Sequence, residues 1–176
     1  GLVPSSVAEL VRRGHQVLVE TKAGQGIGAD DAKYKVAGAE IASSAADVFA
    51  RAEMIVKVKE PQPNEWVQLS SKQILFTYLH LAADAPQAFG LAEAGCTAIA
   101  YETITDNAGG LPLLAPMSEV AGRLAVIEGT SHLKANAGGR GIMISGVPGT
   151  APAEGVVIGG GGGGANAAEM AVRVGA

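Results

Sequence analysis

The feature of the sequence that most constrains its fold is an alternation of short apolar segments with helix-like ones. Strand-like segments start at residues 54 (MIVKVK), 73 (QILFTYLHLA) and 97 (TAIAYET). Between and before them lie segments with helical periodicity, such as PSSVAELVRRGH from residue 4. This order predicts an α/β protein built of βαβ units on a mostly parallel sheet, with helices on both faces and nearly apolar strands.

The same alternation continues to the C-terminus. The pattern predicts helices at 31–37, 44–52, 85–94 and about 117–134, and strands at 16–21, 142–147 and 155–158, the last followed by a glycine turn and a helix. Ser5 or Ser6 is expected to cap the first helix. Pro116 and Ser118 are start signals for the long helix, with Ser118 as its N-cap.

Composition narrows the classes of function. Of 176 residues, 48% are hydrophobic, which suffices for one sizeable core or two small ones. A net charge of -4 without a basic run gives no source for the phosphate attraction that nucleic-acid binding needs. No signal peptide, apolar run of about 18 residues or metal-ligand spacing is visible, and Cys96 is the single cysteine. We therefore expect a cytoplasmic protein that binds neither nucleic acid, membrane nor metal.

A glycine-rich stretch near the C-terminus carries a nucleotide-binding signal. Gly159, Gly161 and Gly164 fit G-x-G-x-x-G between a predicted strand and a helix. In that pattern the first glycine permits a tight turn, the second lets the backbone approach a pyrophosphate, and the third lets helix and strand pack closely. A run of six glycines satisfies many patterns, so a flexible turn is the alternative. Twelve residues follow Gly164, too few for the second strand of a dinucleotide fold, so we expect a piece of a longer protein.

Two lysines stand in the strand-like segment MIVKVK. A period of two places Ile55, Lys57 and Lys59 on one face of that strand. An edge strand with both ammonium groups in solvent is one explanation. The other is that Lys59, at the carboxyl end of the strand, points into the crevice where open α/β sheets bind ligands.

A histidine ends the next strand-like segment. His80 shares a strand face with Phe76 and Tyr78, and a structural role is the alternative to a functional one. A cation and a histidine at neighbouring strand ends suit a small carboxylate or keto acid, because the ammonium polarises oxygen and the imidazole moves protons near neutral pH. Glu102, near the end of TAIAYET, is placed to hold either residue in position.

Several short sequence motifs resemble those of one protein family. KVKEP, FTYLHLA, TAIAYET, LPLLAPMSEVAGRLA, GGRG and GVPG, followed by the glycine turn, occur in an order and spacing that resemble alanine dehydrogenase over nearly the whole chain. FTYLHLA and LAPMSEVAGR distinguish this resemblance from the related transhydrogenase α subunit. The resemblance implies NAD-dependent interconversion of L-alanine with pyruvate and ammonia, in a cytoplasmic homohexamer.

The resemblance also implies roles for individual residues. It makes Lys59 the substrate-binding lysine and His80 the substrate-binding, acid/base histidine. It places Met117 beside the substrate pocket and Ser118 near the cofactor. It assigns the nucleotide fingerprint to three glycines, Gly159, Gly161 and Gly164.

The resemblance divides the chain by role as well. It implies a substrate domain of Rossmann or flavodoxin-like type at 1–116, a connecting helix at 117–137, and the start of a Rossmann NAD-binding domain at 138–176. The family's carboxylate-binding arginine and catalytic aspartate have no counterpart in this sequence, and the family has larger residues at Gly162 and Gly163. We therefore expect the chain alone not to be a competent dehydrogenase. A transhydrogenase α-like domain and a non-catalytic remnant are the alternatives.

Overall fold

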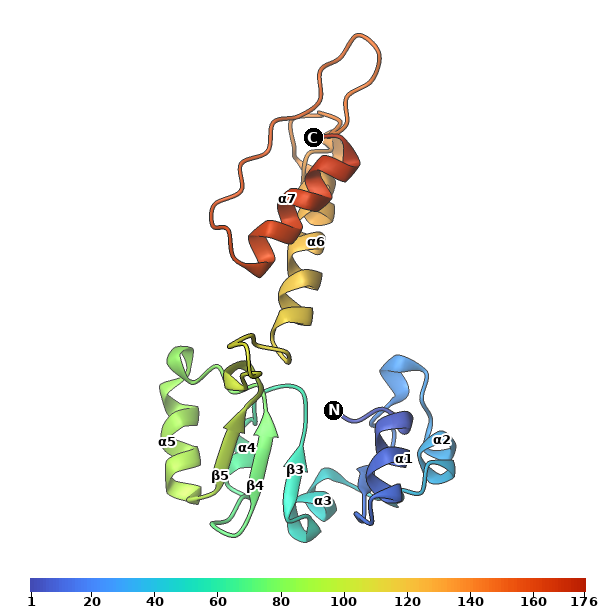
Figure 1. Ribbon diagram of the computed structural model, residues 1–176, viewed down its shortest axis with the longest axis vertical. Helices are drawn as coiled ribbons and strands as arrows, with labels where there is room; N and C mark the ends of the chain where they lie inside the picture. The colour runs from blue at the N-terminus through green and yellow to red at the C-terminus, as the bar shows by residue number, and fades with distance from the viewer. The chain divides into compact units, whose positions relative to one another are not determined.

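A computed structural model describes residues 1–176, which form two compact units, Gly1–Thr103 (unit 1) and Ile104–Ala176 (unit 2). Unit 1 contains every strand, and all strand pairs are parallel, as predicted (Figure 1). Its elements in chain order are α1 (Pro4–Arg12), β1 (Leu18–Glu20), η1 (Gln25–Ile27), α2 (Asp31–Val36), β2 (Glu40–Ala42), α3 (Ala45–Arg51), β3 (Met54–Val56), α4 (Pro63–Trp66), β4 (Ile74–Thr77), η2 (Leu81–Ala83), α5 (Ala85–Ala94), β5 (Thr97–Ala100) and η3 (Tyr101–Thr103).

The strands of unit 1 form two sheets where the sequence predicted one. β1 pairs with β2, and a separate sheet has the order β3-β4-β5. In the second sheet Val56 lies opposite Phe76, and Phe76 lies opposite Ile99. β4 is therefore the central strand, and the carboxyl ends of all three strands meet at one edge.

Local signals set the helix boundaries of unit 1. The Asp84 side chain accepts a hydrogen bond from the N–H of Gln87 and caps α5, which ends at left-handed Gly95. Asp30 caps α2 and Ser44 caps α3 in the same way. The expected serine cap of α1 is wrong, because the helix starts at Pro4 with no side-chain cap.

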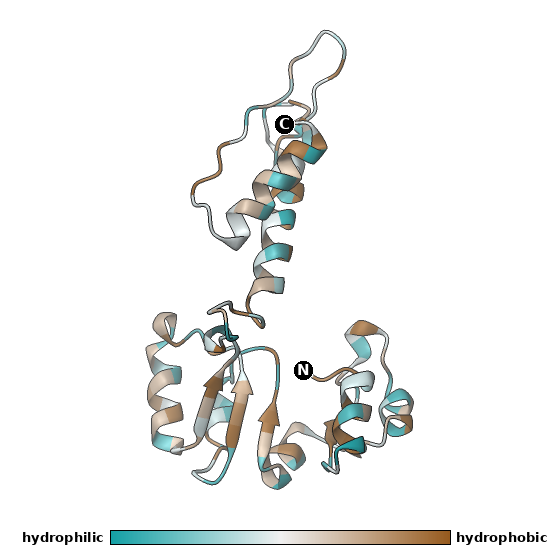
Figure 2. Cartoon of the chain, in the orientation of Figure 1, coloured by the Kyte–Doolittle hydropathy of each residue, from teal (hydrophilic) through white to brown (hydrophobic).

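Two apolar cores hold unit 1. One combines α3, the three-stranded sheet and α5 around Leu75, which is fully buried in β4. Figure 2 shows the strands of this sheet mostly in the brown of hydrophobic residues. The other core joins α1 to α2 through Val7, Tyr34 and neighbouring alanines. A buried amide supports the first core, because Gln73 Nε2 donates to the carbonyls of Phe49 and Ala52 at 2.7 and 2.8 Å.

Unit 2 is a pair of helices joined by a long irregular segment. Its elements are α6 (Ala115–His132), η4 (Ala135–Ala137) and α7 (Gly162–Val174). The two helices pack where they carry glycine: a Cβ on Gly122 would lie 2.2 Å from the carbonyl oxygen of Gly163. Side chains would keep the backbones apart, so this close approach requires glycine at position 122.

Several predicted elements differ in the structure. The strands expected at 142–147 and 155–158 do not form; Val147 and Thr150 make one isolated bridge. Apolar residues alone do not make a strand, because its N–H and C=O groups need a paired neighbour, and unit 2 supplies none. The strands β3, β4 and β5 end earlier than predicted. β2 and α4 were not predicted at all.

Candidate active site

The carboxyl edge of the three-stranded sheet is made by segments that continue beyond β3 and β4. The N–H of Tyr78 donates to the carbonyl of Val58 at 3.2 Å. The Thr77 hydroxyl donates to the carbonyl of Lys59 at 2.9 Å. These bonds keep the two segments side by side past the strand ends, so Lys59 and His80 follow neighbouring strands at the same edge.

The two lysines after β3 have different surroundings. The Lys57 ammonium pairs with the carboxylate of Glu65, and its side chain is 23% exposed. Glu65 also accepts a hydrogen bond from the N–H of Gln62 at 2.7 Å, which fixes it at the start of α4. The Lys59 side chain is 74% exposed, and its Nζ lies 3.9 Å from a Glu60 oxygen, beyond hydrogen-bond length. The charge of Lys59 is thus available to a ligand, whereas that of Lys57 is neutralised within the fold.

His80 occupies a left-handed turn shortly after β4, which ends at Thr77. Its backbone φ is +50°, and its side chain is exposed. The Glu102 carboxylate accepts hydrogen bonds from the N–H groups of His80 at 2.7 Å and Leu79 at 3.1 Å. Burial raises the pKa of Glu102, but these backbone hydrogen bonds outweigh it and hold that pKa below its ordinary value. Glu102 therefore holds His80 through the backbone; His80 is one of the two residues that the sequence analysis expected Glu102 to hold in position.

A group of aromatic rings supports the His80 imidazole. The imidazole stacks on the ring of Tyr78, with ring centres 5.8 Å apart and planes 7° from parallel. Tyr101 packs edge-on against Tyr78 at 5.0 Å and against Phe76 at 4.4 Å. Burial, and to a smaller extent the neighbouring Tyr78, raises the pKa of Tyr101. The rings from two neighbouring strands thus support the imidazole from one side.

The segment before His80 is also held from α5. Gln87 is fully buried, and its Nε2 donates to the carbonyl of Leu79 at 2.5 Å. Its Oε1 is buried without a hydrogen-bond partner, which costs free energy. Gln87 lies in the first turn of α5, and no sequence pattern distinguished it from other helix residues.

The glycine turn of unit 2 requires glycine at two of the three predicted positions. Gly159 has a φ of +98°, which side-chain-bearing residues rarely adopt. A Cβ on Gly164 would lie 1.9 Å from the carbonyl oxygen of Gly159, so the turn requires glycine there. Gly161 precedes α7 and has open space around its Cα, and no side chain caps this helix. Uncapped N–H groups at a helix start can bind an anion.

Met117 and Ser118 lie in the first turn of α6. The helix begins at Ala115, so the prediction of Ser118 as N-cap is wrong; its own N–H already donates to the carbonyl of Leu114 at 3.1 Å. A Cβ on Gly162 would lie 3.4 Å from the Cβ of Ser118, which places Ser118 against the start of α7. Met117 is about half exposed.

The candidate residues thus fall into two groups. Lys59 and His80 belong to unit 1, at the edge of the three-stranded sheet; the residues of unit 2 are Met117, Ser118, Gly159, Gly161 and Gly164. Sequence reasoning missed Glu65 as the partner of Lys57. The helix start that positions Glu65 did have a sequence signal, because Gln62 and Glu65 have the spacing of a capping box.

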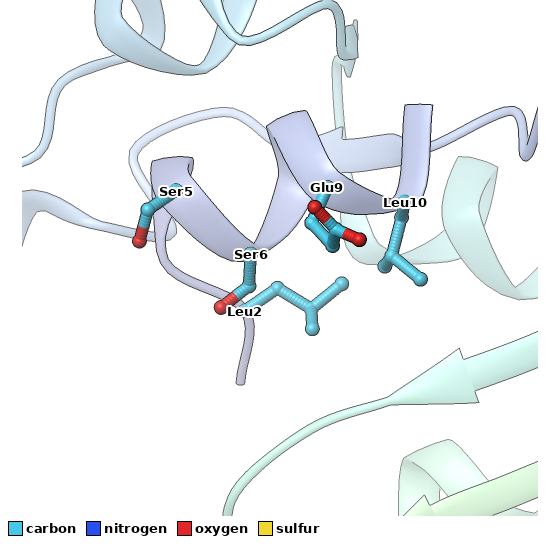
Figure 3. Close-up of a pocket in the computed structure, with 5 residues that line it drawn as sticks. All are labelled: Leu2, Ser5, Ser6, Glu9 and Leu10. Carbon is cyan, nitrogen blue, oxygen red and sulfur yellow. The ribbon is translucent and has the colours of Figure 1, made fainter. Parts of the chain in front are cut away.

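Two surface hollows of the structure contain none of the predicted site residues. A hollow of about 440 Å³ lies along α1 and is lined by Leu2, Ser5, Ser6, Glu9 and Leu10 (Figure 3). A second, also of about 440 Å³, is lined by Lys22, Gln25, Gly28, Asp30, Asp31 and Ala32. No group of three or more histidine, cysteine, aspartate or glutamate side chains is placed to hold a metal ion. None of the helices has the length and hydrophobicity needed to cross a membrane.

Comparisons with known proteins place the whole chain in one family. Residues 1–121 match the N-terminal domain of alanine dehydrogenase/PNT, and residues 125–176 match its C-terminal domain. The alanine dehydrogenases of Halomonas elongata and Bacillus subtilis are 55% and 50% identical over 175 residues, 99% of this chain. The chain spans about half the length of these relatives, 47% and 46% respectively.

Solved structures agree with this assignment. An L-alanine dehydrogenase matches with a TM-score of 0.90 and 50% identity, covering 100% of this chain and 48% of its own. The transhydrogenase from Sinorhizobium meliloti matches less well, with a TM-score of 0.74 and 30% identity over 99% of this chain and 52% of its own. The fold, the sequence motifs and both domain matches lead to one conclusion: the chain belongs to the alanine dehydrogenase/PNT family.

Proposed function

We propose that this chain forms the substrate-binding part and the first cofactor-binding turn of an NAD-dependent alanine dehydrogenase. The observation that carries the proposal is the position of Lys59 and His80, which follow neighbouring parallel strands at one sheet edge in a chain 55% identical to such an enzyme. The reaction is the reversible oxidative deamination of L-alanine to pyruvate and ammonia. The likeness to transhydrogenase is the alternative, weaker both in identity and in TM-score.

The exposed Lys59 ammonium is proposed to bind an oxygen of the keto acid. Its charge has no hydrogen-bonded partner in the fold, so it can form a charge-assisted hydrogen bond to a carboxylate or carbonyl oxygen. The same contact polarises the carbonyl for addition of ammonia. Lys57 cannot serve equally well, because Glu65 already neutralises it.

His80 is proposed to move the protons of the reaction. An imidazole exchanges protons near neutral pH, and the exposed ring stacked on Tyr78 is accessible from solvent. It donates a proton to the oxygen that leaves as water during amination, and accepts one in the reverse direction. Met117 is proposed to border the substrate pocket.

The backbone of the glycine turn supports NAD as the proposed cofactor. Gly159 makes the tight turn, Gly164 permits its close contact with the start of α7, and Gly161 leaves the space above the helix start open. These three glycines and Ser118 are proposed to hold the cofactor, with the amides of α7 against its phosphates. When bound, NAD⁺ accepts a hydride from the α-carbon of alanine.

The proposal assigns roles to the parts of the chain. We assign residues 1–116 to substrate binding, 117–137 to a connecting helix and 138–176 to the start of the NAD-binding domain. The resemblance also suggests a cytoplasmic homohexamer.

The test compares two lysine variants in a full-length protein that carries this chain. Lys59→Met should lower kcat/KM for pyruvate by roughly tenfold to a hundredfold, because a charge-assisted hydrogen bond contributes about 1.5 to 3 kcal/mol. NADH affinity should be unchanged. Lys57→Met is the matched control and should reduce stability while leaving kcat/KM within about threefold.

Two outcomes would contradict the proposal. A large loss of kcat/KM in both variants, or in Lys57→Met alone, would contradict the assignment of Lys59, rather than Lys57, as the substrate-binding lysine. Binding of NADH without any pyruvate-dependent oxidation in the unsubstituted protein would favour the transhydrogenase-like alternative.

A further inference from the structure

Two non-glycine residues in the chain have a left-handed backbone, Lys22 and His80. In both, the backbone N–H donates to a carboxylate at 2.7 Å: that of Lys22 donates to Asp31, and that of His80 donates to Glu102. A left-handed conformation is unfavourable for residues with a Cβ, so it persists where the surrounding structure enforces it. In each case a carboxylate from a later element supplies that constraint.

The constraint on His80 is the more extensive of the two. Glu102 also accepts the N–H of Leu79, and Gln87 of α5 holds the carbonyl of Leu79. Holding it leaves Gln87 Oε1 buried and unpaired. The left-handed residue is thus His80 itself, and the unpaired buried acceptor belongs to the α5 side chain that holds the residue before it. Such departures from favourable local structure concentrate at functional sites.

We propose that Glu102 is a positioning residue that fixes the left-handed turn at His80 and thereby the orientation of its imidazole towards the keto acid. This inference rests on the proposed function, because it assumes that His80 transfers protons to the substrate. The carboxylate does not touch the substrate in this scheme. It acts on the backbone, and the stacking of the ring on Tyr78 then determines where the imidazole nitrogens lie.

The expected kinetic effect lies in turnover. Proton transfer requires the imidazole within hydrogen-bond reach of the reacting oxygen, and a misplacement of about 1 Å can reduce the rate about a hundredfold. Binding of pyruvate through Lys59 does not depend on this turn. Loss of Glu102 should therefore lower kcat for pyruvate and leave KM nearly unchanged.

The first test uses the 176-residue chain and needs no enzymatic activity. The amide proton shifts of His80 and Leu79, followed by NMR, should titrate together with the Glu102 carboxyl group, and both amides should be protected from hydrogen exchange. In Glu102→Ala both effects should disappear. Asp31→Asn, which removes the equivalent carboxylate at Lys22, is the matched control and should leave the His80 amide unchanged. Persistence of the His80 protection in Glu102→Ala would overturn the proposal.

The second test measures kinetics in a full-length protein that carries the chain. Glu102→Ala should lower kcat for pyruvate about 10- to 100-fold with KM changed less than about threefold. Glu102→Gln, which keeps an acceptor for the two N–H groups, should recover part of that loss. Glu93→Gln, an exposed substitution on α5, should have no effect. A lowered melting temperature with unchanged kcat in both Glu102 variants would show a merely structural role and overturn the proposal.

The two tests separate this inference from the proposed function. Suppose that the unsubstituted protein does not reduce pyruvate, while the amide shift of His80 titrates with the Glu102 carboxyl group. The proposed function then fails, and the hydrogen bonding of the His80 backbone to Glu102 is confirmed. If the unsubstituted protein is active and Glu102→Ala retains its kcat, the positioning role fails and the proposed function remains. Should Glu102→Ala prove unfolded by Trp66 fluorescence, Glu102→Gln decides: an unchanged kcat together with loss of the hydrogen-exchange protection of the His80 amide overturns the proposal.

Discussion

The two units of this chain are held together by different kinds of packing. All the buried apolar side chains belong to unit 1, whereas the buried residues of unit 2 are the glycines Gly122 and Gly146. Unit 2 leaves large apolar side chains in solvent, such as Val156 and Ile158. Its two helices pack through backbone contact at Gly122, without a closed apolar core. The spacing of apolar residues alone therefore does not predict whether they are buried, because similar apolar patterns are buried in one unit and exposed in the other.

The aromatic residues sharpen this contrast and also provide a probe. The single Trp, the three Tyr and the three Phe all lie in unit 1. Trp66 packs against the core around Leu75. Its fluorescence therefore reports unit 1 alone, while amide hydrogen exchange in α6 and α7 reports unit 2.

The largest expected effect is the loss of a core side chain from unit 1. Leu75→Ala should lower the free energy of unfolding of unit 1 by about 2 to 5 kcal/mol, because it removes buried apolar area and leaves a cavity. Urea denaturation followed by Trp66 fluorescence measures it. Ile158→Ala in unit 2 is the control, since Ile158 is 95% exposed; hydrogen exchange of the α6 and α7 amides should show that it changes the stability of unit 2 by less than about 0.5 kcal/mol. Equal effects of the two variants would refute the contrast between the units.

The second effect concerns glycine packing in unit 2. Gly122→Ala should destabilise the α6–α7 pair by about 1 to 3 kcal/mol, because its methyl group would meet the Gly163 carbonyl at 2.2 Å. Hydrogen exchange of α7 amides measures the loss. Gly129→Ala lies in the same helix with open space around it, and should stabilise α6 by up to about 1 kcal/mol. If both variants stabilise, the helices are not held by close backbone contact.

A third effect is the response of unit 1 to acid. Because the folded pKa of Glu102 is below its ordinary value, its carboxylate stabilises the fold above the unfolded pKa of about 4.3. That contribution is lost as the pH falls through the lower, folded pKa. The urea concentration at the unfolding midpoint, followed by Trp66 fluorescence, should therefore be measured at several pH values. It should fall more between about pH 6 and pH 3 in the unsubstituted chain than in Glu102→Gln. Identical pH dependence in both would show that Glu102 does not stabilise the turn.

The smallest expected effect is that of salt on unit 2. Glu169 bonds to Arg173 at 2.6 Å and to Arg123 of α6 at 3.3 Å, and these exposed hydrogen bonds and charges lower the pKa of Glu169. Exposed ion pairs contribute about 0.2 to 1 kcal/mol and are screened by salt. Exchange of the α7 amides should accelerate slightly in about 1 M NaCl, and Glu169→Gln should abolish this salt response. A salt response that persists in the variant would assign it to other charges.

The sequence predicted much of unit 1 because its signals are local. Helix α5 was predicted at its observed bounds, since Asp84 caps its start and Gly95 ends it. The parallel α/β class followed from the alternation of apolar segments with helices. Lys59 and His80 were identified as strand-end residues, and their roles stay predictions.

The sequence could not determine where the strands end or which of them pair. A period of two continues through Lys57 and Tyr78, but β3 ends at Val56 and β4 at Thr77, before the left-handed turn of His80. The apolar residues at 155–158 satisfy a strand pattern, yet without a neighbouring strand in unit 2 they stay unpaired.

Lys57 and Lys59 show most clearly what each level determines. The sequence by itself predicted both lysines on one face of a strand from the backbone period, but the strand ends at Val56, before either lysine. The tertiary structure alone decided their difference, since it placed Glu65 of α4 against Lys57 and left Lys59 exposed. Residue type and spacing are local properties of the chain, whereas the charge that a residue faces depends on how distant segments pack.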